Sequence, residues 1–261
     1  MRQRLQWRDV TKYIRYLAEG GESYGILDGE TVRELRGDPF GEHTPTGRAH
    51  QLASVKLLCP CRPAKILCVG LNYKSHLGGR PQPTRPEIFY KPLSAMQDPG
   101  APIVTPHDAT DLHYEGEMVA VIGKQARNAS PEDARAAIFG VTCGNDVSER
   151  NWQHGAGKDL QWWRAKGSDT FAPFGPAIAV GADYGNLRLT TRLNGEIVQQ
   201  QSTSDLIFDC AAIVSWISAW ITLYPGDIIY TGTPGSTRKI SPGDVVRVEL
   251  EGVGVLENPV A

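Results

Sequence analysis

Glu115 and Glu117 are separated by one glycine and begin an apolar run. If this segment is a β-strand, side chains two positions apart point to the same face, so the two carboxylates lie close together. Among apolar residues they repel each other and lose hydration, and a hard divalent cation offsets both costs. The alternative is a solvated face with an inert pair, but Val119 and Val121 continue the same face. The spacing therefore favours a metal site.

A third carboxylate, Asp146, follows a second apolar run. If a helix begins at Asp146, then Arg150 and Gln153 lie on the same helical face as this residue. A metal ligand, a guanidinium and an amide would converge there, a combination suited to an anionic, oxygen-rich substrate. The alternative is an aspartate that caps a helix and forms an exposed pair with Arg150.

Three further residues could handle charge or protons. Lys166 follows two tryptophans closely and precedes a glycine, so partial desolvation could shift the pKa of its ammonium group. The alternative is that its aliphatic stem covers aromatic surface while its charge stays in water. His76 follows the apolar segment 65–69 on a loop, which suits proton transfer, although a lone loop histidine is more often inert. Thr233 also follows a strand-like segment and could bind a carboxylate. No phosphate-binding or dinucleotide fingerprint and no Gly-x-Ser-x-Gly elbow occurs.

The elements that must position these residues are mostly strands. Apolar, β-branched runs predict strands at residues 65–69, 114–122 and 177–180. Asn194-Gly195 is typical of a two-residue hairpin turn. Helices are fewer: Ser130 and the residues after it predict a helix to Ile138, and apolar spacing predicts another over 205–222. The sequence therefore predicts a mainly β (α+β) fold, a rolled sheet or barrel-like architecture.

The chain divides near Cys59-Pro60-Cys61, where prolines restrict the backbone. We predict a small, β-rich N-terminal domain over residues 1–62 and a catalytic, metal-binding domain over 63–261. The first domain carries no cluster of reactive groups. Cys59 and Cys61 lack the second pair that a zinc site needs, and the total of five cysteines favours reduced thiols.

Charge and hydropathy exclude several classes of protein. The net charge is −2, with 27 basic and 29 acidic residues interspersed, so we expect no nucleic-acid partner. No apolar run reaches the roughly 20 residues that span a bilayer, so no membrane partner is expected. The basic start of the chain, Met1 to Trp7, lacks the apolar core of a secretory signal. We therefore expect a soluble, cytoplasmic protein.

Taken in this order, the Glu-x-Glu pair, Asn145-Asp146-Val147-Ser148 and the segment from Lys166 to Phe171 resemble the fumarylacetoacetate hydrolase family, from about Lys65 to the C-terminus. The resemblance implies a mixed β-roll behind a smaller N-terminal domain, and a homodimer. It implies Mg²⁺ or Mn²⁺ held by Glu115, Glu117 and Asp146. The predicted catalytic residues are His76 and Lys166, and the predicted substrate-binding residues are Arg150, Gln153, Lys91 and Thr233.

The resemblance also implies a small 2-oxo or 1,3-diketo acid as substrate and hydrolysis of its C–C bond, as with acylpyruvates. Many small hydrolytic members carry a glutamate three residues after the histidine, where this chain has Gly79. Unless Glu87 replaces it, water activation is weakened. Oxaloacetate tautomerisation or decarboxylation, or isomerisation of a 2-hydroxy-diene-dioate, is the alternative, because one proton shuttle suffices. The alternative outside enzymes is a β protein stabilised by a metal.

Overall fold

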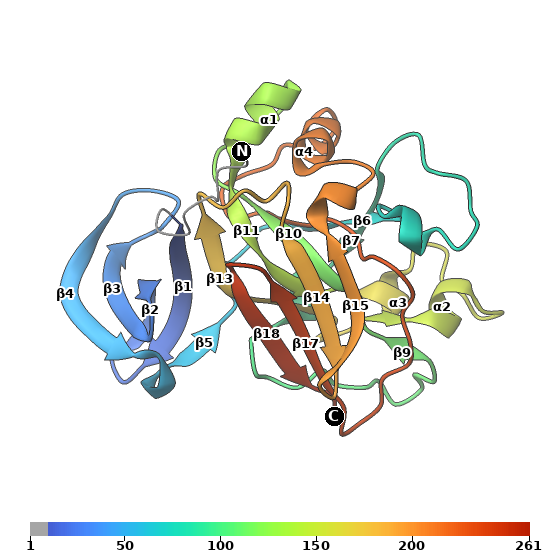
Figure 1. Cartoon of the computed structure of the whole chain (residues 1–261), viewed down its shortest axis with the longest axis horizontal. Helices are drawn as coiled ribbons and strands as arrows, with labels where there is room; N and C mark the ends of the chain where they lie inside the picture. The colour runs from blue at the N-terminus through green and yellow to red at the C-terminus, as the bar shows by residue number, and fades with distance from the viewer. Residues whose placement is uncertain (1–9) are drawn as a thin grey trace, which may run out of the picture.

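The structure, a computed structural model, describes residues 10–261, so the first nine residues of the predicted N-terminal domain lie outside this range. Strands predominate (Figure 1), which confirms the predicted mainly β fold. The strands are β1 (Thr11–Ala18), β2 (Gly21–Asp28), β3 (Thr31–Gly37), β4 (His43–Gln51), β5 (Lys56–Leu58), β6 (Ile66–Gly70), β7 (Glu87–Lys91), β8 (Met96–Gln97), β9 (Leu112–His113), β10 (Gly116–Ile122), β11 (Ile138–Asn145), β12 (Ser148–Glu149), β13 (Ala172–Val180), β14 (Arg188–Leu193), β15 (Glu196–Ser202), β16 (Ile228–Tyr230), β17 (Val245–Leu250) and β18 (Gly254–Pro259). The helices are α1 (Pro131–Ala137), α2 (Arg150–His154), α3 (Trp163–Gly167) and α4 (Cys210–Ser218), with 3-10 turns η2 (Leu52–Ser54), η3 (Lys74–His76), η4 (Leu93–Ala95) and η5 (Thr203–Asp205).

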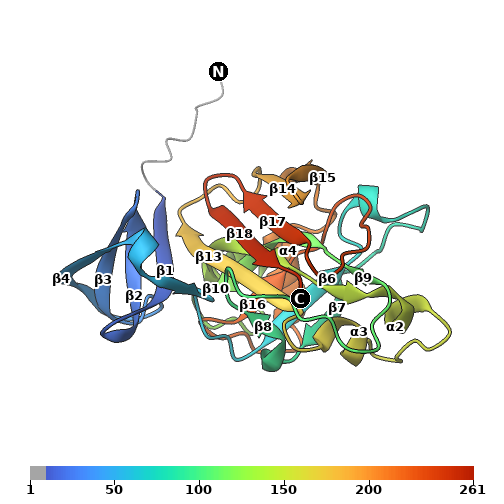
Figure 2. The same ribbon diagram turned by 90° about the horizontal axis from the view of Figure 1, so that it is seen from below.

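Two sheets pack face to face to form the roll. Within the described chain the larger sheet has twelve strands, and its main path runs β4-β3-β2-β1-β13-β11-β10-β16-β6-β7. The four-stranded sheet β15-β14-β17-β18 lies across the middle of this path (Figures 1 and 2). Met118 and Ala120 of β10 join Val246 and Val248 of β17 in the main apolar core, which fixes the two layers against each other.

Strand β10 is buried on both faces, and this burial determines where its carboxylates lie. Every residue of Gly116–Ile122 is buried. Met118 and Ala120 face the four-stranded sheet, whereas Val119 and Val121 belong to a second core on the opposite side. Because strand side chains alternate, Glu117 shares the side of Val119 and Val121, away from the four-stranded sheet.

The N-terminal strands form an antiparallel meander, β1 to β4, which agrees with the β-rich segment expected there. Strand β1 also pairs with β13, with Tyr13 opposite Ile178. Ala177 of β13 packs with Ile14 and Tyr16 of β1 in one small core. The large sheet therefore runs continuously across the predicted boundary at residue 62 (Figure 1).

Local signals in the sequence predict the turns and one of the two helices well. Ser130 caps α1 by accepting a hydrogen bond from the Asp133 N–H, as predicted. Asn194 and Gly195 have positive φ angles of 52° and 88°, as the tight turn between β14 and β15 requires. The predicted helix over 205–222 is wrong in extent, because α4 begins only at Cys210, after the Asp209 cap.

The region before α4 is held by a distant residue rather than by helical hydrogen bonds. Asn72 accepts the Ile207 N–H through its backbone carbonyl and the Phe208 N–H through its side chain, at 2.8 Å each. These contacts use the backbone donors that a longer helix would need.

Two expectations from composition can be compared with the described residues. Among residues 10–261, no helix is long and apolar enough to cross a membrane. The five cysteines are free and buried, in keeping with reduced thiols that act as small apolar side chains. In the same range the one group of three or more potential metal ligands does not include Cys59 or Cys61.

Candidate metal and active site

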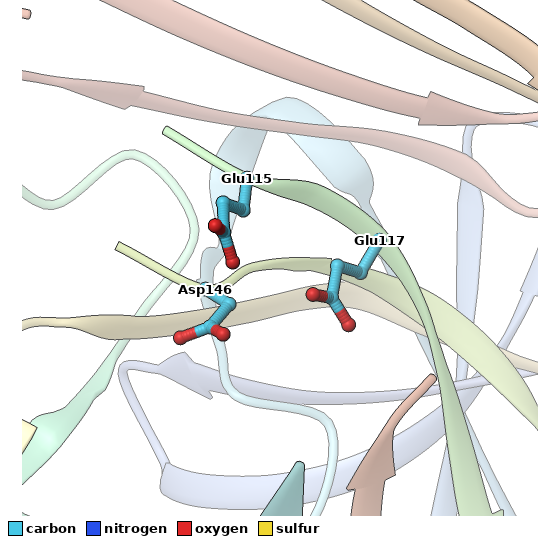
Figure 3. A group of neighbouring side chains, drawn as sticks. All are labelled: Glu115, Glu117 and Asp146. Carbon is cyan, nitrogen blue, oxygen red and sulfur yellow. The ribbon is translucent and has the colours of Figure 1, made fainter. Parts of the chain in front are cut away.

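The three predicted metal ligands converge at one end of the paired strands β10 and β11. Glu115 directly precedes β10, Glu117 is the second residue of this strand, and Asp146 follows the last residue of β11. Gly116 is opposite Asn145 in this antiparallel pair, so the strand ends meet. Ligand oxygens of the three carboxylates all lie within 4.8 Å of one another (Figure 3). The three residues are 5%, 2% and 1% exposed, so the solvated alternative is excluded.

Backbone contacts fix the spacing of this cluster. The Glu115 N–H donates to Asn145 Oδ1, and the Asp146 N–H donates to the Glu115 carbonyl, both at 2.9 Å. A Cβ at Gly116 would lie 1.9 Å from Thr191 Oγ1 on the four-stranded sheet, so only glycine fits between the two glutamates. The packing of the two sheets thus sets the position of both carboxylates.

Lys166 of α3 lies between two of the carboxylates. Its Nζ is 2.7 Å from Glu115 Oε2 and 2.6 Å from Asp146 Oδ2, and 5.0 Å from the centroid of the Phe89 ring. Burial would lower the pKa of Lys166, but Asp146 and Glu115 outweigh burial and raise the pKa. Lys166 is therefore a fixed cation. The expectation that desolvation tunes its ammonium is not met, because the carboxylate charges dominate.

Glu115 is ionised for the complementary reason. Burial alone would raise the pKa of its carboxyl group, but Lys166, Arg150 and His76 hold that pKa well below the ordinary value. The Arg150 Nη2 donates to Glu115 Oε1 at 2.5 Å. Glu115 is thus neutralised by side chains of the protein itself.

Glu117 has no positively charged side chain paired with it among the described residues, and a bound cation would supply the missing positive charge. Burial, followed by the charges of Asp146 and Glu115, raises the pKa of Glu117 well above its ordinary value. Within the described chain its carboxylate accepts one hydrogen bond, from the Gly232 N–H at 2.6 Å, and forms no ion pair. Three carboxylates offer the hard oxygen ligands that Mg²⁺ and Mn²⁺ take. The residues present therefore fit a divalent cation.

The predicted substrate-binding residue Lys91 lies behind the carboxylates. Its Nζ is 2.6 Å from Asp146 Oδ1 and donates to the carbonyls of Val147, Lys166 and Phe171. The cavity in front of the carboxylates is lined by the other eight predicted site residues and not by Lys91. Lys91 therefore orients Asp146 without lining this cavity.

Arg150 and Gln153 reach the site by a route that the sequence did not predict. The helix expected at Asp146 is wrong in its start: Ser148 and Glu149 form the short strand β12, and α2 begins at Arg150 with Glu149 as its cap. The Arg150 Nη1 donates to Gln153 Oε1 at 2.7 Å while its Nη2 contacts Glu115. The expected convergence of the two side chains on the carboxylates is nevertheless present.

His76 lies on η3 at the edge of the cavity. Its Nδ1 is 2.5 Å from the Gly235 carbonyl, and its Nε2 is 3.9 Å from Glu115 Oε1. Because a carbonyl only accepts hydrogen bonds, Nδ1 carries the proton and the basic Nε2 faces the carboxylates. Glu87 does not replace the missing glutamate, since its side chain is 57% exposed and lies 3.8 Å from Arg85.

Thr233 contributes mainly by holding the cavity wall. Its hydroxyl donates to the Gly116 carbonyl at 2.8 Å and accepts from the Gln199 Nε2 at 2.9 Å. Gln199 Oε1 in turn accepts the Gly116 N–H at 3.2 Å. Gln199 was missed in the sequence, where only the hairpin that carries it could be recognised.

The cavity has a volume of about 350 Å³, near the lower end for small-molecule sites. Besides the predicted residues, its wall includes Arg80, Phe89, His154 and Trp162. Of these, Trp162 belongs to the tryptophan motif before Lys166. The others come from segments with no recognisable pattern, and only the fold brings them together.

The fold and the site define a class of protein: an enzyme whose β-roll buries carboxylates beside fixed cations in a small cavity. Comparison with known proteins gives the family. Residues 65–261 match the fumarylacetoacetate (FAA) hydrolase C-terminal family, and residues 11–60 match the Rv2993c-like, N-terminal family. The chain belongs to the fumarylacetoacetate hydrolase family, as its motifs indicate.

Three similar proteins cover most of the chain. Protein Rv2993c of Mycobacterium tuberculosis is 44% identical over 259 residues, which cover 94% of this chain and 96% of that protein. Oxaloacetate tautomerase fahd2, mitochondrial, of Xenopus laevis is 40% identical over 221 residues, covering 80% of this chain and 69% of that protein. The crystal structure of 2-hydroxyhepta-2,4-diene-1,7-dioate isomerase from Mycobacterium marinum has a TM-score of 0.89 and 42% identity, covering 96% of this chain and 98% of that one.

Proposed function

We propose that this protein is a divalent-metal-dependent isomerase that moves a proton next to the 2-oxo group of a small dicarboxylic acid, with oxaloacetate enol–keto exchange as the representative reaction. The names of the tautomerase and isomerase relatives support the reaction class. The observation that carries the proposal is the orientation of His76: its Nδ1 contacts the Gly235 carbonyl instead of a carboxylate, and its basic Nε2 faces Glu115.

Glu115, Glu117 and Asp146 would hold Mg²⁺ or Mn²⁺, and the bound cation would polarise a 2-oxo group and lower the energy of the enolate. Lys166 places a fixed positive charge between Glu115 and Asp146, where negative charge develops on the substrate oxygen.

The proton itself moves through His76. Its Nε2 takes a proton from the carbon next to the 2-oxo group, and the resulting imidazolium returns a proton to the enolate oxygen. The Gly235 carbonyl keeps the ring in one orientation throughout, because it accepts the Nδ1 hydrogen in both protonation states. Arg150 and Gln153 present a guanidinium and an amide that can orient the substrate carboxylate.

Hydrolysis of a C–C bond, the first prediction from the sequence, needs a further step, since a water molecule must be deprotonated and directed at the carbonyl. Gly79 supplies no acid for this step, and Glu87 lies exposed beside Arg85. Hydrolysis therefore stays a prediction, and enol–keto exchange is the function that the site supports better.

The test is a substrate panel with Mg²⁺. Purified protein is mixed with freshly dissolved enol oxaloacetate, and loss of the enol absorbance is followed against an acylpyruvate hydrolysis assay. We expect metal-dependent acceleration of enol–keto exchange and slow hydrolysis. Rapid hydrolysis of an acylpyruvate without acceleration of enol–keto exchange would overturn the proposal in favour of the hydrolase.

A further inference from the structure

The cavity has a buried inner end and an exposed outer end. The inner end holds the carboxylate cluster and Lys166, all buried, whereas Arg80 and His154 at its wall are exposed. Phe89 and Trp162 line the space with aromatic surface, and their rings lie 5.7 Å apart. An elongated acid that enters with its 2-oxo end first would therefore place its far end beside Arg80 and His154.

Arg80 is held close to the catalytic histidine by the chain itself. It follows His76 by four residues, and its backbone N–H donates to the Leu77 carbonyl at 3.0 Å. The same turn thus carries both the partly exposed His76 and the exposed Arg80 to the cavity wall. Nothing lies within 4 Å of a Cβ at Gly79, so the turn is not packed against other residues there.

Arg80 differs from the other arginines near the site in having no carboxylate partner. Arg150 pairs with Glu115, Arg164 with Asp159 and Arg85 with Glu87. Among residues 10–261 no ion pair or side-chain hydrogen bond involves Arg80, although it lines a cavity that contains three carboxylates.

His154 adds a neutral group to the same end. Although His154 is exposed, partial desolvation of its ring and the positive charges of Arg150, Arg80 and Lys166 lower its pKa, so the imidazole is uncharged at neutral pH. The formal positive charge at the outer end of the cavity is therefore that of Arg80, and a guanidinium presents paired donors that match a carboxylate.

From this arrangement we infer that Arg80 is the specificity residue that binds the second, distal carboxylate of the substrate and so selects dicarboxylic over monocarboxylic 2-oxo acids. The inference rests on the proposed function, which places the 2-oxo end at the carboxylate cluster. It concerns a residue outside the proton-transfer and metal-binding machinery.

The test compares two acids of equal length that differ in the second carboxylate: oxaloacetate and 2-oxobutanoate. Their dissociation constants are measured by calorimetry with Mg²⁺ for the wild type and for the variants R80Q, R80K and R85Q. The R85Q variant is the matched control, since Arg85 lies on the same loop and its side chain is 64% exposed.

We expect R80Q to weaken oxaloacetate binding about tenfold, in the lower range for a hydrogen bond between charged groups, because Arg80 is exposed. Binding of 2-oxobutanoate should change less than about twofold, R80K should fall between the wild type and R80Q, and R85Q should match the wild type. Raising the ionic strength should reduce the preference of the wild type for oxaloacetate.

Equal weakening of both acids in R80Q, or no weakening of either, would overturn the inference. If the preference depends on Arg80 but the wild type does not accelerate enol–keto exchange, the proposed function fails and the inference stands. If the wild type accelerates the exchange while R80Q keeps the full preference, the inference fails alone. If neither acid binds the wild type, both fail.

Discussion

Replacing Glu117 with Gln should make the metal-free protein more stable and the metal-loaded protein less stable than the wild type. Glu117 is buried beside Asp146 and Glu115, and its raised pKa shows that ionisation is opposed in the metal-free state. Glutamine has nearly the same shape and carries no charge. The substitution therefore removes the repulsion, and with it a ligand charge that the cation needs.

The size of the effect follows from the geometry. Two unit charges 4.8 Å apart, the limit within which these oxygens lie, repel by about 3.5 kcal/mol at an effective dielectric constant of about 20. The gain should be of this order or smaller, because the carboxyl group of Glu117 can be protonated instead of ionised. In a chain of this size, about 3.5 kcal/mol corresponds to a rise in Tm of roughly 7–14 °C.

The gain should depend on pH in a defined direction. The pKa of Glu117 in the folded state lies above the ordinary value of 4.5, so the metal-free folded protein binds more protons here than the unfolded chain does. The wild type therefore loses stability as pH rises from about 4.5 towards the raised pKa. The Glu117→Gln variant lacks this loss, so the two proteins should be similar in stability near pH 4.5 and diverge above it.

Thermal unfolding in EDTA and in excess Mg²⁺, across pH 5 to 8, measures both effects. Mg²⁺ should raise the Tm of the wild type and leave the variant nearly unchanged, since a ligand stabilises only the state that binds it. Glu257→Gln is the control, because this carboxylate is 52% exposed and its pair with Arg247 contributes little. Equal stabilisation of wild type and Glu117→Gln by Mg²⁺, or a difference in EDTA that does not vary with pH, would refute the reasoning.

Three further predictions follow from the site and the sheet. His76→Gln should slow enol–keto exchange roughly 10²–10⁴-fold at unchanged fold, whereas His107→Gln, whose ring is 95% exposed, should not; equal rates would exclude His76 as the proton carrier. Gly79→Glu should raise acylpyruvate hydrolysis at a small cost in stability, since φ at this position is +83°; hydrolysis that is already fast and does not rise would show that the position is irrelevant. Arg48→Gln should lower Tm by unpairing the buried Glu34 while KM stays unchanged, and a changed KM would mean that the N-terminal strands take part in the site.

The carboxylate cluster could be predicted because the signal lies within one strand. Glu115 and Glu117 differ by two positions, and the alternation of a strand puts them on one face whatever surrounds it. Local reasoning failed for the backbone after Asp146, since Ser148 pairs with His113 and prolongs extended backbone where a helix was expected. For such short segments, pairing with a distant strand determines whether the backbone is extended or helical.

Lys91 and Arg80 show the limit of sequence reasoning in opposite ways. Lys91 was assigned to the substrate, but its ammonium is surrounded by backbone carbonyls and Asp146, contacts that only the folded chain creates. Arg80 was overlooked because a loop arginine between glycine and proline has no distinguishing pattern. A cavity wall assembled from distant segments is a property of the fold and not of any one segment.

The pairing of β1 with β13 has a consequence for anyone who wishes to produce the catalytic segment alone. A chain cut at residue 62 would lose the strand that satisfies the backbone groups of β13 and would expose Ala177 and its neighbours. An uncovered, largely apolar sheet edge recruits other chains, so the shortened protein would tend to aggregate. The N-terminal strands thus cover the edge of the large sheet at β13. Insolubility of a fragment that lacks them would therefore not show whether those strands contact the substrate.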